Sequence, residues 1–314
     1  MKKTNDFGKF DFVGNIGIFG GISLVLTFVS LVYLATTGIN YGIDFRGGTE
    51  VQVKFADQSV TIDQLRKTVE TLNIGDASLQ SIGENSEFVI RFQTPKKPTE
   101  KEQNEEMQVL LGKLKSTIET TYKDQTPEIR RVDTVGPQVG AELKRNGFLA
   151  VFYCLLVILG YVAFRFDYQY APGAVICLFH DAVITLAIYN LMGKELNVPA
   201  LAAIMTLIGF SLNDTIVVFD RIRETVGNYY DKGWPFIINK AINDMLGRTI
   251  ITSGTVFTSA LCLYIFADGA VKDIAFALTV GIVFGVYSSI YVAAPMIIVI
   301  DKLRGSKLSR AQNA

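Results

Sequence analysis

The sequence predicts a polytopic α-helical membrane protein that carries one α+β domain between its first and second membrane-spanning helices. Of its 314 residues, 49% are hydrophobic and 19% are charged. The apolar residues gather into one run near the N-terminus and a dense block in the C-terminal half, and the polar segment 38–147 separates them. Long apolar runs of this kind indicate membrane spans, and a polar segment of domain size indicates a soluble insertion.

Six apolar stretches are each close to the ~20 residues that an α-helix needs to cross about 30 Å of hydrocarbon. The predicted spans are residues 15–37, 148–164, 171–192, 197–219, 249–267 and 273–300. Lys2, Lys3 and Lys9 precede the first span, as they would in a signal peptide. This run is longer than the apolar region of a signal peptide and shows no evident small-residue cleavage site, so we expect a retained helix.

The lysines and arginines of the short loops predict the orientation. They concentrate in residues 1–14, in the loop 220–248 and in the tail 301–314, and Arg165 lies between spans two and three. The opposite loops carry only Lys194 and Lys272. The positive-inside rule therefore places both termini in the cytoplasm and the domain 38–147 outside. Trp234 and neighbouring tyrosines predict a short interfacial helix within the loop 220–248.

The outer domain has the order of elements that a ferredoxin-like unit requires. An alternating strand around Val51–Phe55 is followed by a helix that begins at a Thr61–Gln64 capping box. Two strands, a second helix and the strand Ile129–Val135 follow. The resulting order βαββαβ predicts a four-stranded split unit.

Other features of the composition exclude several classes of function. The formal net charge is zero, so no global field attracts nucleic acid. The three cysteines, Cys154, Cys177 and Cys262, lie inside apolar runs without metal-ligand spacing, which is typical of small core hydrophobes. No nucleophile–base pair, metal cluster or phosphate-binding loop stands out. We therefore expect no catalytic residue, no metal and no enzyme activity.

Asp214 is the most informative residue of the membrane block. It lies near the end of span four, six residues before Asp220, so a helix places it roughly 9 Å inside the membrane boundary. An ionisable group at that depth costs a few kcal/mol, and such residues normally face a protein interior or a water path. Ser211 lies on the same helix face and Asn213 flanks it. The pattern predicts a functional carboxylate.

Span five carries a polar stripe that could meet Asp214. Arg248, Thr252, Thr255 and Ser259 stand at i, i+4, i+7 and i+11, which is one face of a helix. If this face meets span four, Asp214 and Arg248 come within pairing distance. Two simpler interpretations stay open, since Arg248 suits an interfacial anchor and small hydroxyl residues also serve as helix-packing contacts.

His180 and Asp181 lie near the middle of span three, and His180 is the only histidine of the chain. A histidine beside an aspartate at this depth suits a proton relay. The two residues are adjacent, however, so their side chains point about 100° apart and cannot both face one partner. A packed, hydrogen-bonded core histidine is the alternative interpretation.

Five segments together resemble the SecD/SecF family of bacterial protein-export membrane proteins, on its SecF side. They are Gly42–Glu50, Val135–Leu143, His180-Asp181, Gly209–Glu224 and Asn243–Ser253. Their order matches a layout of one helix, an outer domain and five further helices. The resemblance implies one half of a resistance-nodulation-division type fold in the bacterial cytoplasmic membrane.

The resemblance also implies a function and a set of residues. A SecF subunit would pair with SecD, associate with the SecYEG channel and often YajC, and use the proton-motive force to promote late export of unfolded preproteins. It would need no resident cofactor, because the coupling ion is H⁺, or Na⁺ in some relatives. The family's ion-coupling aspartate falls on Asp214, and its arginine falls on Arg248.

The remaining matched positions would form the domain hinge and pack against partners. They are Asp44, Arg46, Gly47, Gly48, Gly136 and Pro137. Two other functions remain open at this point. The chain could be a non-conducting scaffold that stabilises SecD and the channel, or a self-sufficient small-molecule exporter.

Overall fold

The computed structural model describes residues 8–56, 59–72, 74, 77–82, 86–93, 100–166 and 169–304. Two compact units divide the chain. Unit 1 contains residues 1–40, 150–194 and 199–314, and unit 2 contains residues 41–149 and 195–198. The inserted domain is therefore a body of its own, to which the short connection 195–198 also belongs.

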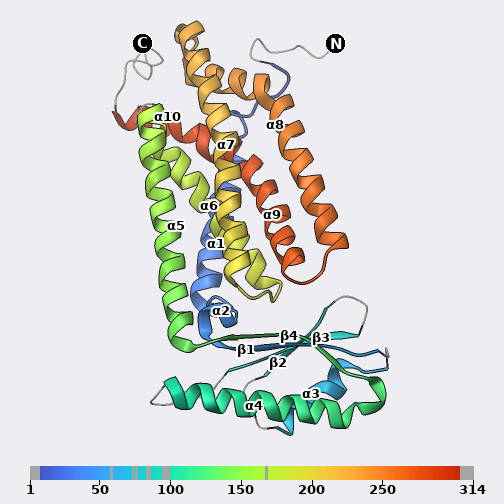
Figure 1. Cartoon of the computed structure of the whole chain (residues 1–314). Helices are drawn as coiled ribbons and strands as arrows, with labels where there is room; N and C mark the ends of the chain where they lie inside the picture. The colour runs from blue at the N-terminus through green and yellow to red at the C-terminus, as the bar shows by residue number, and fades with distance from the viewer. Residues whose placement is uncertain are drawn as a thin grey trace. The chain divides into compact units, whose positions relative to one another are not determined.

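Unit 2 is an antiparallel sheet with one short and one long helix on one face (Figure 1). Its strands are β1 (Gly48–Lys54), β2 (Ser78–Ile82), β3 (Glu87–Phe92) and β4 (Glu128–Val135), in the order β2-β3-β1-β4. The helices are α3 (Ile62–Glu70) and α4 (Glu100–Thr121), and a short 3₁₀ turn, Lys123–Gln125, precedes β4. This element order and strand order confirm the predicted ferredoxin-like unit.

Alternation along the strands builds the core of unit 2. Val51 and Val53 of β1 are fully buried, and Ile90 of β3 pairs with Val51. Leu65 of α3 and Leu114 of α4 cover them from one side. The predicted capping box is present, because Thr61 accepts from the Gln64 backbone and the Gln64 side chain accepts from the Thr61 backbone.

A glycine pair joins α2 (Ile43–Arg46) to β1. Gly47 has φ 75° and Gly48 has φ 144°, in regions that residues with a Cβ rarely adopt. A Cβ on Gly47 would lie 2.8 Å from the Pro137 Cα, and one on Gly140 would lie 2.9 Å from the Gly47 nitrogen. The segments 42–50 and 135–143 therefore pack backbone against backbone within unit 2.

The connection between α6 (Ala171–Leu191) and α7 (Val198–Asn228) is bound within unit 2. The Gly42 N–H donates to the Leu196 carbonyl at 2.7 Å, and the Asp44 carboxylate accepts from the Val198 N–H at 2.8 Å. Because Val198 begins α7, Asp44 satisfies one of the free N–H groups at the start of that helix.

Unit 1 contains six helical segments that are long and apolar enough to cross a membrane. They are α1 (Ile16–Thr37), α5 (Pro137–Arg165), α6, α7, α8 (Gly233–Phe266) and the run of α9 (Gly269–Ser288), a π-helical segment η3 (Ser289–Ala293) and α10 (Ala294–Arg304). α5 begins in unit 2 and continues into unit 1. The sequence thus predicts the number of spans, and the fold class is confirmed.

Two helices differ in extent from their predicted spans. α7 continues to Asn228, and a 3₁₀ turn at Tyr230–Lys232 leads directly into α8. The interfacial helix predicted within the loop 220–248 and span five therefore form one helix of 34 residues. Ion pairs hold this region to α7, since Arg221 lies between Glu224 and Asp244, and Asp244 also binds Lys240.

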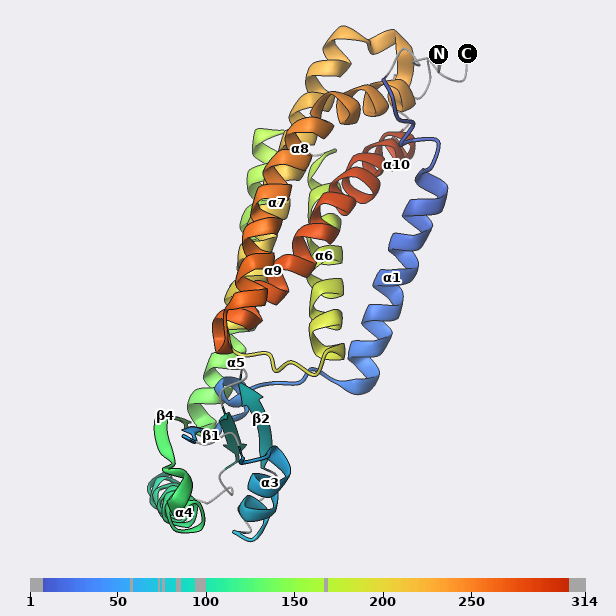
Figure 2. The same cartoon turned by 90° about the vertical axis from the view of Figure 1, so that its right-hand side faces the viewer.

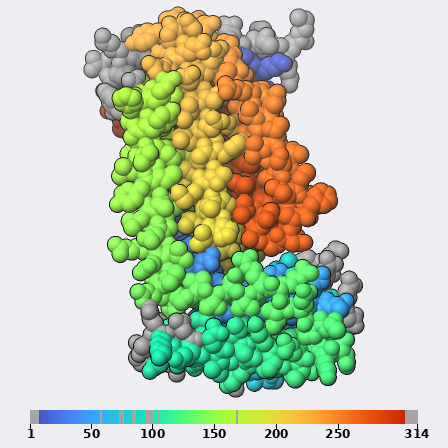
Figure 3. All heavy atoms as spheres, viewed as in Figure 1, coloured from blue at the N-terminus to red at the C-terminus, as the bar shows by residue number. Residues whose placement is uncertain are grey.

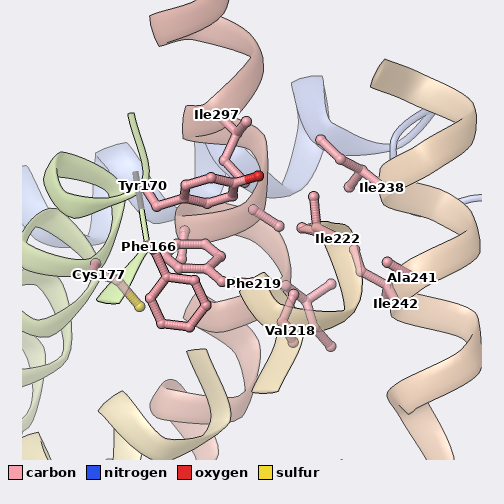
Figure 4. Close-up of a cluster of buried hydrophobic side chains, with 14 of the residues drawn as sticks. Phe166, Tyr170, Cys177, Val218, Phe219, Ile222, Ile238, Ala241, Ile242 and Ile297 are labelled. Carbon is pink, nitrogen blue, oxygen red and sulfur yellow. The ribbon is translucent and has the colours of Figure 1, made fainter. Parts of the chain in front are cut away.

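A buried apolar cluster lies where α7 ends and α8 begins (Figure 4). Phe219 and Ile222 of α7 pack there with Tyr170, with Ile238 of α8 and with Ile297 of α10. The N-terminal segment contacts the same part of α8, because the Asn239 side chain accepts from the Phe12 and Val13 N–H groups. These contacts fix the start of α8 in place.

Small residues on α9 allow close packing with its neighbours. α9 contacts α6 and α8, and α1 packs on the other side of α6 (Figure 2). A Cβ on Gly281 would overlap the Leu207 side chain, and one on Gly285 would lie 3.2 Å from the Ser211 Cβ. The stripe of Ala277, Gly281 and Gly285 is therefore a packing face.

We predict that Gly47→Ala destabilises unit 2 by about 1–3 kcal/mol, because the φ of 75° strains any side chain and the new Cβ would meet Pro137. Gly136→Ala is the matched control, since open space surrounds that position. Thermal unfolding and limited proteolysis of both purified variants measure the difference. Equal stability of the two variants would contradict this prediction.

Candidate functional site

Asp214 is buried inside unit 1, as its position in the sequence predicts. Its side chain is 3% exposed, on the face of α7 that meets α8. The Ser253 hydroxyl of α8 donates to the Asp214 Oδ2 at 2.6 Å. α7 lies between α5 and α8 on the face that Figure 3 shows. A carboxylate at this depth therefore has one hydroxyl donor from the adjacent helix.

Arg248 lies near Asp214 but does not form an ion pair with it. The guanidinium is close enough for a favourable Coulomb interaction with the carboxylate, yet the described residues show no N–O contact within 4.0 Å between them. Arg248 is exposed on α8, one turn and a half before Ser253.

The predicted hydroxyl stripe of α8 faces away from Asp214. Thr252, Thr255 and Ser259 are exposed, as Arg248 is, and each donates to a carbonyl of its own helix. The buried stripe is one residue later in the sequence, at Thr249 and Ser253. The condition that the stripe beginning at Arg248 meets span four is therefore not met in this structure, where Ser253 contacts Asp214.

A second buried carboxylate joins three helices. Asp181 of α6 is fully buried, and its Oδ2 accepts from Ser211 of α7 at 2.5 Å and from Ser288 of α9 at 2.8 Å. The Cys177 thiol lies against Ser288, with Sγ and Oγ 3.0 Å apart, and Thr215 lies 3.7 Å from the same sulfur. Ser211, which the sequence groups with Asp214, therefore binds Asp181.

His180 contacts its neighbour Asp181 while its ring packs elsewhere. The Nδ1 atom lies 2.8 Å from the Asp181 Oδ1, and the ring is stacked on Tyr287 with centroids 6.5 Å apart. The Nε2 atom is buried and has no hydrogen-bond partner within the part of the chain that the structure describes. The interpretation as a packed, hydrogen-bonded core histidine therefore agrees with the contacts of Nδ1 and of the ring, and it leaves the Nε2 atom unexplained.

The other predicted residues lie apart from these carboxylates. Asn213 is exposed on α7. The glycines, Asp44 and Pro137 belong to unit 2, where Gly47 packs on Pro137 and Asp44 caps α7, and Arg46 ends α2. Among the described residues no group of three or more His, Cys, Asp or Glu side chains could hold a metal ion.

Sequence reasoning missed Ser253, Ser288 and Cys177 as polar partners of the two carboxylates, and it missed Thr215, which contacts Cys177. Ser253 differs from the predicted Thr252 by one position, and only packing decides which stripe faces inward. Ser288 stands three residues after Gly285, so the small-residue face of α9 was the available signal. Where a helix packs closely on its neighbour, a hydroxyl residue one turn further along the same face also lies near polar groups of the neighbouring helix.

Two family models match the chain, in the regions where the site and the glycine pair lie. The model described as protein export membrane protein SecD/SecF, C-terminal, matches residues 114–303. The model described as the SecD/SecF GG motif matches residues 32–58, which include Gly47 and Gly48. Together they cover the end of α1, the start of unit 2, and the chain from within α4 to within α10.

Curated relatives of similar length carry the name protein translocase subunit SecF. The protein from Desulfurispirillum indicum is 40% identical over 280 residues, which is 88% of this chain and 87% of the relative. The protein from Calditerrivibrio nitroreducens is 40% identical over 300 residues, which is 94% of this chain and 95% of the relative.

The fold also matches solved structures of longer chains. A crystal structure of SecDF, described as a translocon-associated membrane protein from Thermus thermophilus, matches with a TM-score of 0.81 and 31% identity over 94% of this chain. A SecDF crystal structure in a super-membrane-facing form matches with a TM-score of 0.68, 31% identity and full coverage of this chain. This chain spans about two fifths of those chains, 39% and 41% respectively.

The fold and the buried carboxylates define a multi-pass membrane protein with an inserted ferredoxin-like domain and ionisable groups among its spans. The chain belongs to the SecD/SecF family of protein-export membrane proteins, and the relatives that it matches over most of their length are SecF subunits.

We predict that Ser253→Ala destabilises unit 1 by about 1–3 kcal/mol, because it leaves the buried Asp214 carboxyl group without its Ser253 hydrogen-bond partner. Thr252→Ala is the neighbouring control and should change stability by less than about 0.5 kcal/mol, since that hydroxyl is exposed and binds its own helix. Thermal unfolding in detergent measures both. A larger loss of stability for Thr252→Ala than for Ser253→Ala would contradict the assignment of Ser253 to the buried face of α8.

Proposed function

We propose that this chain is the SecF subunit of a Sec accessory complex that uses the proton-motive force to promote late stages of protein export. Asp214 carries the proposal, because it is a buried carboxylate on a membrane helix with one serine donor and an arginine nearby but unpaired. Ionisable groups inside membrane spans mark ion pathways and proton relays. Family membership supports the role in export.

Movement of α8 along α7 would couple the proton to a conformational change. When Arg248 approaches, it favours the ionised carboxylate and a proton leaves; when Arg248 withdraws, burial favours the neutral acid and a proton binds. One charge that crosses the membrane is worth about 2.3 kcal/mol per 100 mV. At about 1.4 kcal/mol per tenfold, this energy shifts a two-state equilibrium roughly fiftyfold without ATP.

The proposal includes a second, SecD-type subunit. The solved SecDF chains are more than twice as long as this chain, so more than half of each lies beyond the matched part. The face of α8 that carries Arg248, Thr252, Thr255 and Ser259 is exposed in this chain. A helix face that carries three hydroxyl groups and an arginine packs more favourably against another protein than against lipid, because a protein can pair with the charge and the hydroxyl groups.

Further parts of the proposal follow from family membership. The complex would act on the SecYEG channel, often with YajC, and on unfolded preprotein in the bacterial cytoplasmic membrane. Both termini would be cytoplasmic and the domain 38–147 would lie outside; residues 1–7 and 305–314 are outside the described part of the chain. The chain would move an ion, H⁺ or in some relatives Na⁺, without a resident cofactor and without covalent catalysis.

We predict that Asp214→Asn abolishes gradient-dependent preprotein release while the chain still inserts and assembles, because the amide cannot exchange a proton. Arg248→Met should cause the same loss, since nothing then drives the proton off. The measurement is ion flux and preprotein release in vesicles that contain the purified pair of subunits.

Asp220→Asn is the matched control for Asp214→Asn. It makes the same chemical change six residues later on α7, where the carboxylate is exposed and lies 3.7 Å from Arg165. It should retain full release. Full release by Asp214→Asn and Arg248→Met would instead support a non-conducting scaffold, and assembly without a second subunit would support a self-sufficient exporter.

A further inference from the structure

The Asp181 carboxylate is buried with no fixed counter-ion. It is fully buried, and among the described residues the only ion-pair partner of Asp181 is His180, a residue that is charged only when protonated. Ser211, Ser288 and the His180 Nδ1 supply its hydrogen-bond donors. These neutral donors orient the carboxylate and stabilise its charge in part, but they do not neutralise it.

His180 is arranged to supply the missing charge. Its Nδ1 faces the acceptor Asp181 Oδ1, so Nδ1 carries a hydrogen and Nε2 carries the free lone pair of the neutral ring. The Nε2 atom is buried, the residue is 3% exposed, and no described residue hydrogen-bonds to that atom. A buried nitrogen without a hydrogen-bond partner costs free energy of folding, and such an atom often has a functional role.

We propose that the His180–Asp181 dyad is a second proton-binding site of this chain, which takes its proton at the His180 Nε2 and communicates with Asp214 through Ser211. Uptake places H⁺ on the Nε2 lone pair and turns the neutral imidazole into an imidazolium that pairs with the Asp181 carboxylate. The charge of the dyad changes from −1 to zero, and release reverses the step at the same atom. Asp181 is the positioning residue.

The link to Asp214 runs through α7. Ser211 donates to Asp181, and Asp214 stands three residues later, on the adjacent turn of the same helix. Thr215 extends the contact, because it lies against Cys177 at the edge of the Asp181 cluster. Asp214 belongs to α7 and Asp181 contacts that helix through Ser211, so we expect a negative charge on one carboxylate to disfavour a negative charge on the other.

The helix that carries Ser288 changes to a π-helical segment at this site. The π-helical turn Ser289–Ala293 begins directly after Ser288, and such turns occur often at functional sites. A shift of that turn would move the Ser288 hydroxyl relative to Asp181. The hydrogen bond of 2.8 Å from Ser288 to Asp181 therefore links the charge of the dyad to the local geometry of α9.

The titratable groups around the dyad are few. Cys177 lies on α6 itself, Tyr287 stacks on His180 from α9, and Tyr291 of η3 contacts Tyr287. α7 contributes Asp214, on the turn after Ser211. α1 carries Tyr33 as its only titratable residue, and Tyr33 contacts Asn190 at the C-terminal end of α6. α10 carries Asp301, Lys302 and Arg304 in its last turn. The imidazole is thus the group best suited to exchange a proton here.

A single histidine makes the test direct. The full chain is produced with ¹⁵N-labelled histidine and an affinity tag without histidine, reconstituted in phospholipid vesicles, and examined by nitrogen NMR between about pH 5 and 9, the range in which histidine commonly titrates. The expected result is a change from a ring with a bare Nε2 to a ring with both nitrogens protonated. A ring that keeps one protonation state over the whole range overturns the proposal.

Matched variants test the link. Asp181→Asn should abolish the protonated ring, and Asp214→Asn should displace the titration along the pH axis, while Asp220→Asn should leave it in place. A titration that Asp214→Asn leaves unchanged overturns the link through Ser211. His180→Asn, which keeps a donor near Asp181, should lower proton flux at least tenfold with assembly intact.

The inference on flux rests on the proposed function, but the NMR titration does not. If Asp214→Asn retains export while His180 still titrates, the proposed coupling role of Asp214 fails and the second proton site stands. If Asp214→Asn loses export while His180 keeps one state, the proposed function stands and the second site is excluded.

Discussion

The cost of placing a carboxylate among apolar helices is the constraint on which the membrane unit depends. Asp181 and Asp214 are both buried, and each draws hydroxyl groups from the helices around it. Asp181 binds α6 to α7 and α9, and Asp214 binds α7 to α8. α7 is therefore held from two sides by polar contacts whose strength depends on charge, and the apolar cluster at its end supplies contacts that do not.

Close approach of backbones makes these polar contacts possible. Ser211 reaches Asp181 where Gly285 leaves room, since a Cβ at Gly285 would press on the Ser211 side chain. The same logic governs unit 2, where Gly47 lets the segments 42–50 and 135–143 meet. In the first case the missing side chain admits a hydrogen bond, and in the second it admits a turn. Both glycine sets were visible in the sequence, but only the structure shows what each one faces.

Hydropathy and periodicity predict most of the fold because they report burial averaged over many residues. The six spans, the capping box at Thr61 and the βαββαβ order all depend on such averages or on local hydrogen bonds. The orientation of α8 depends on a rotation of one residue, about 100°, and both candidate stripes contain hydroxyl residues. Spacing alone could not choose Ser253 over Thr252, or show that Ser211 binds Asp181 in preference to Asp214. Those choices are made by contacts between helices distant in sequence.

The two carboxylates give α7 a property that neither would give alone. Asp44 of unit 2 accepts a hydrogen bond from the first residue of α7, and Glu195 in the preceding connection lies 3.6 Å from Arg91 of β3. The helix that begins at these contacts with unit 2 also carries Asp214 and contacts Asp181. A change of charge at either acid alters the forces on α7 at about the middle of its length. α7 thus joins a first residue whose N–H binds Asp44 to the two buried carboxylate contacts further along its length.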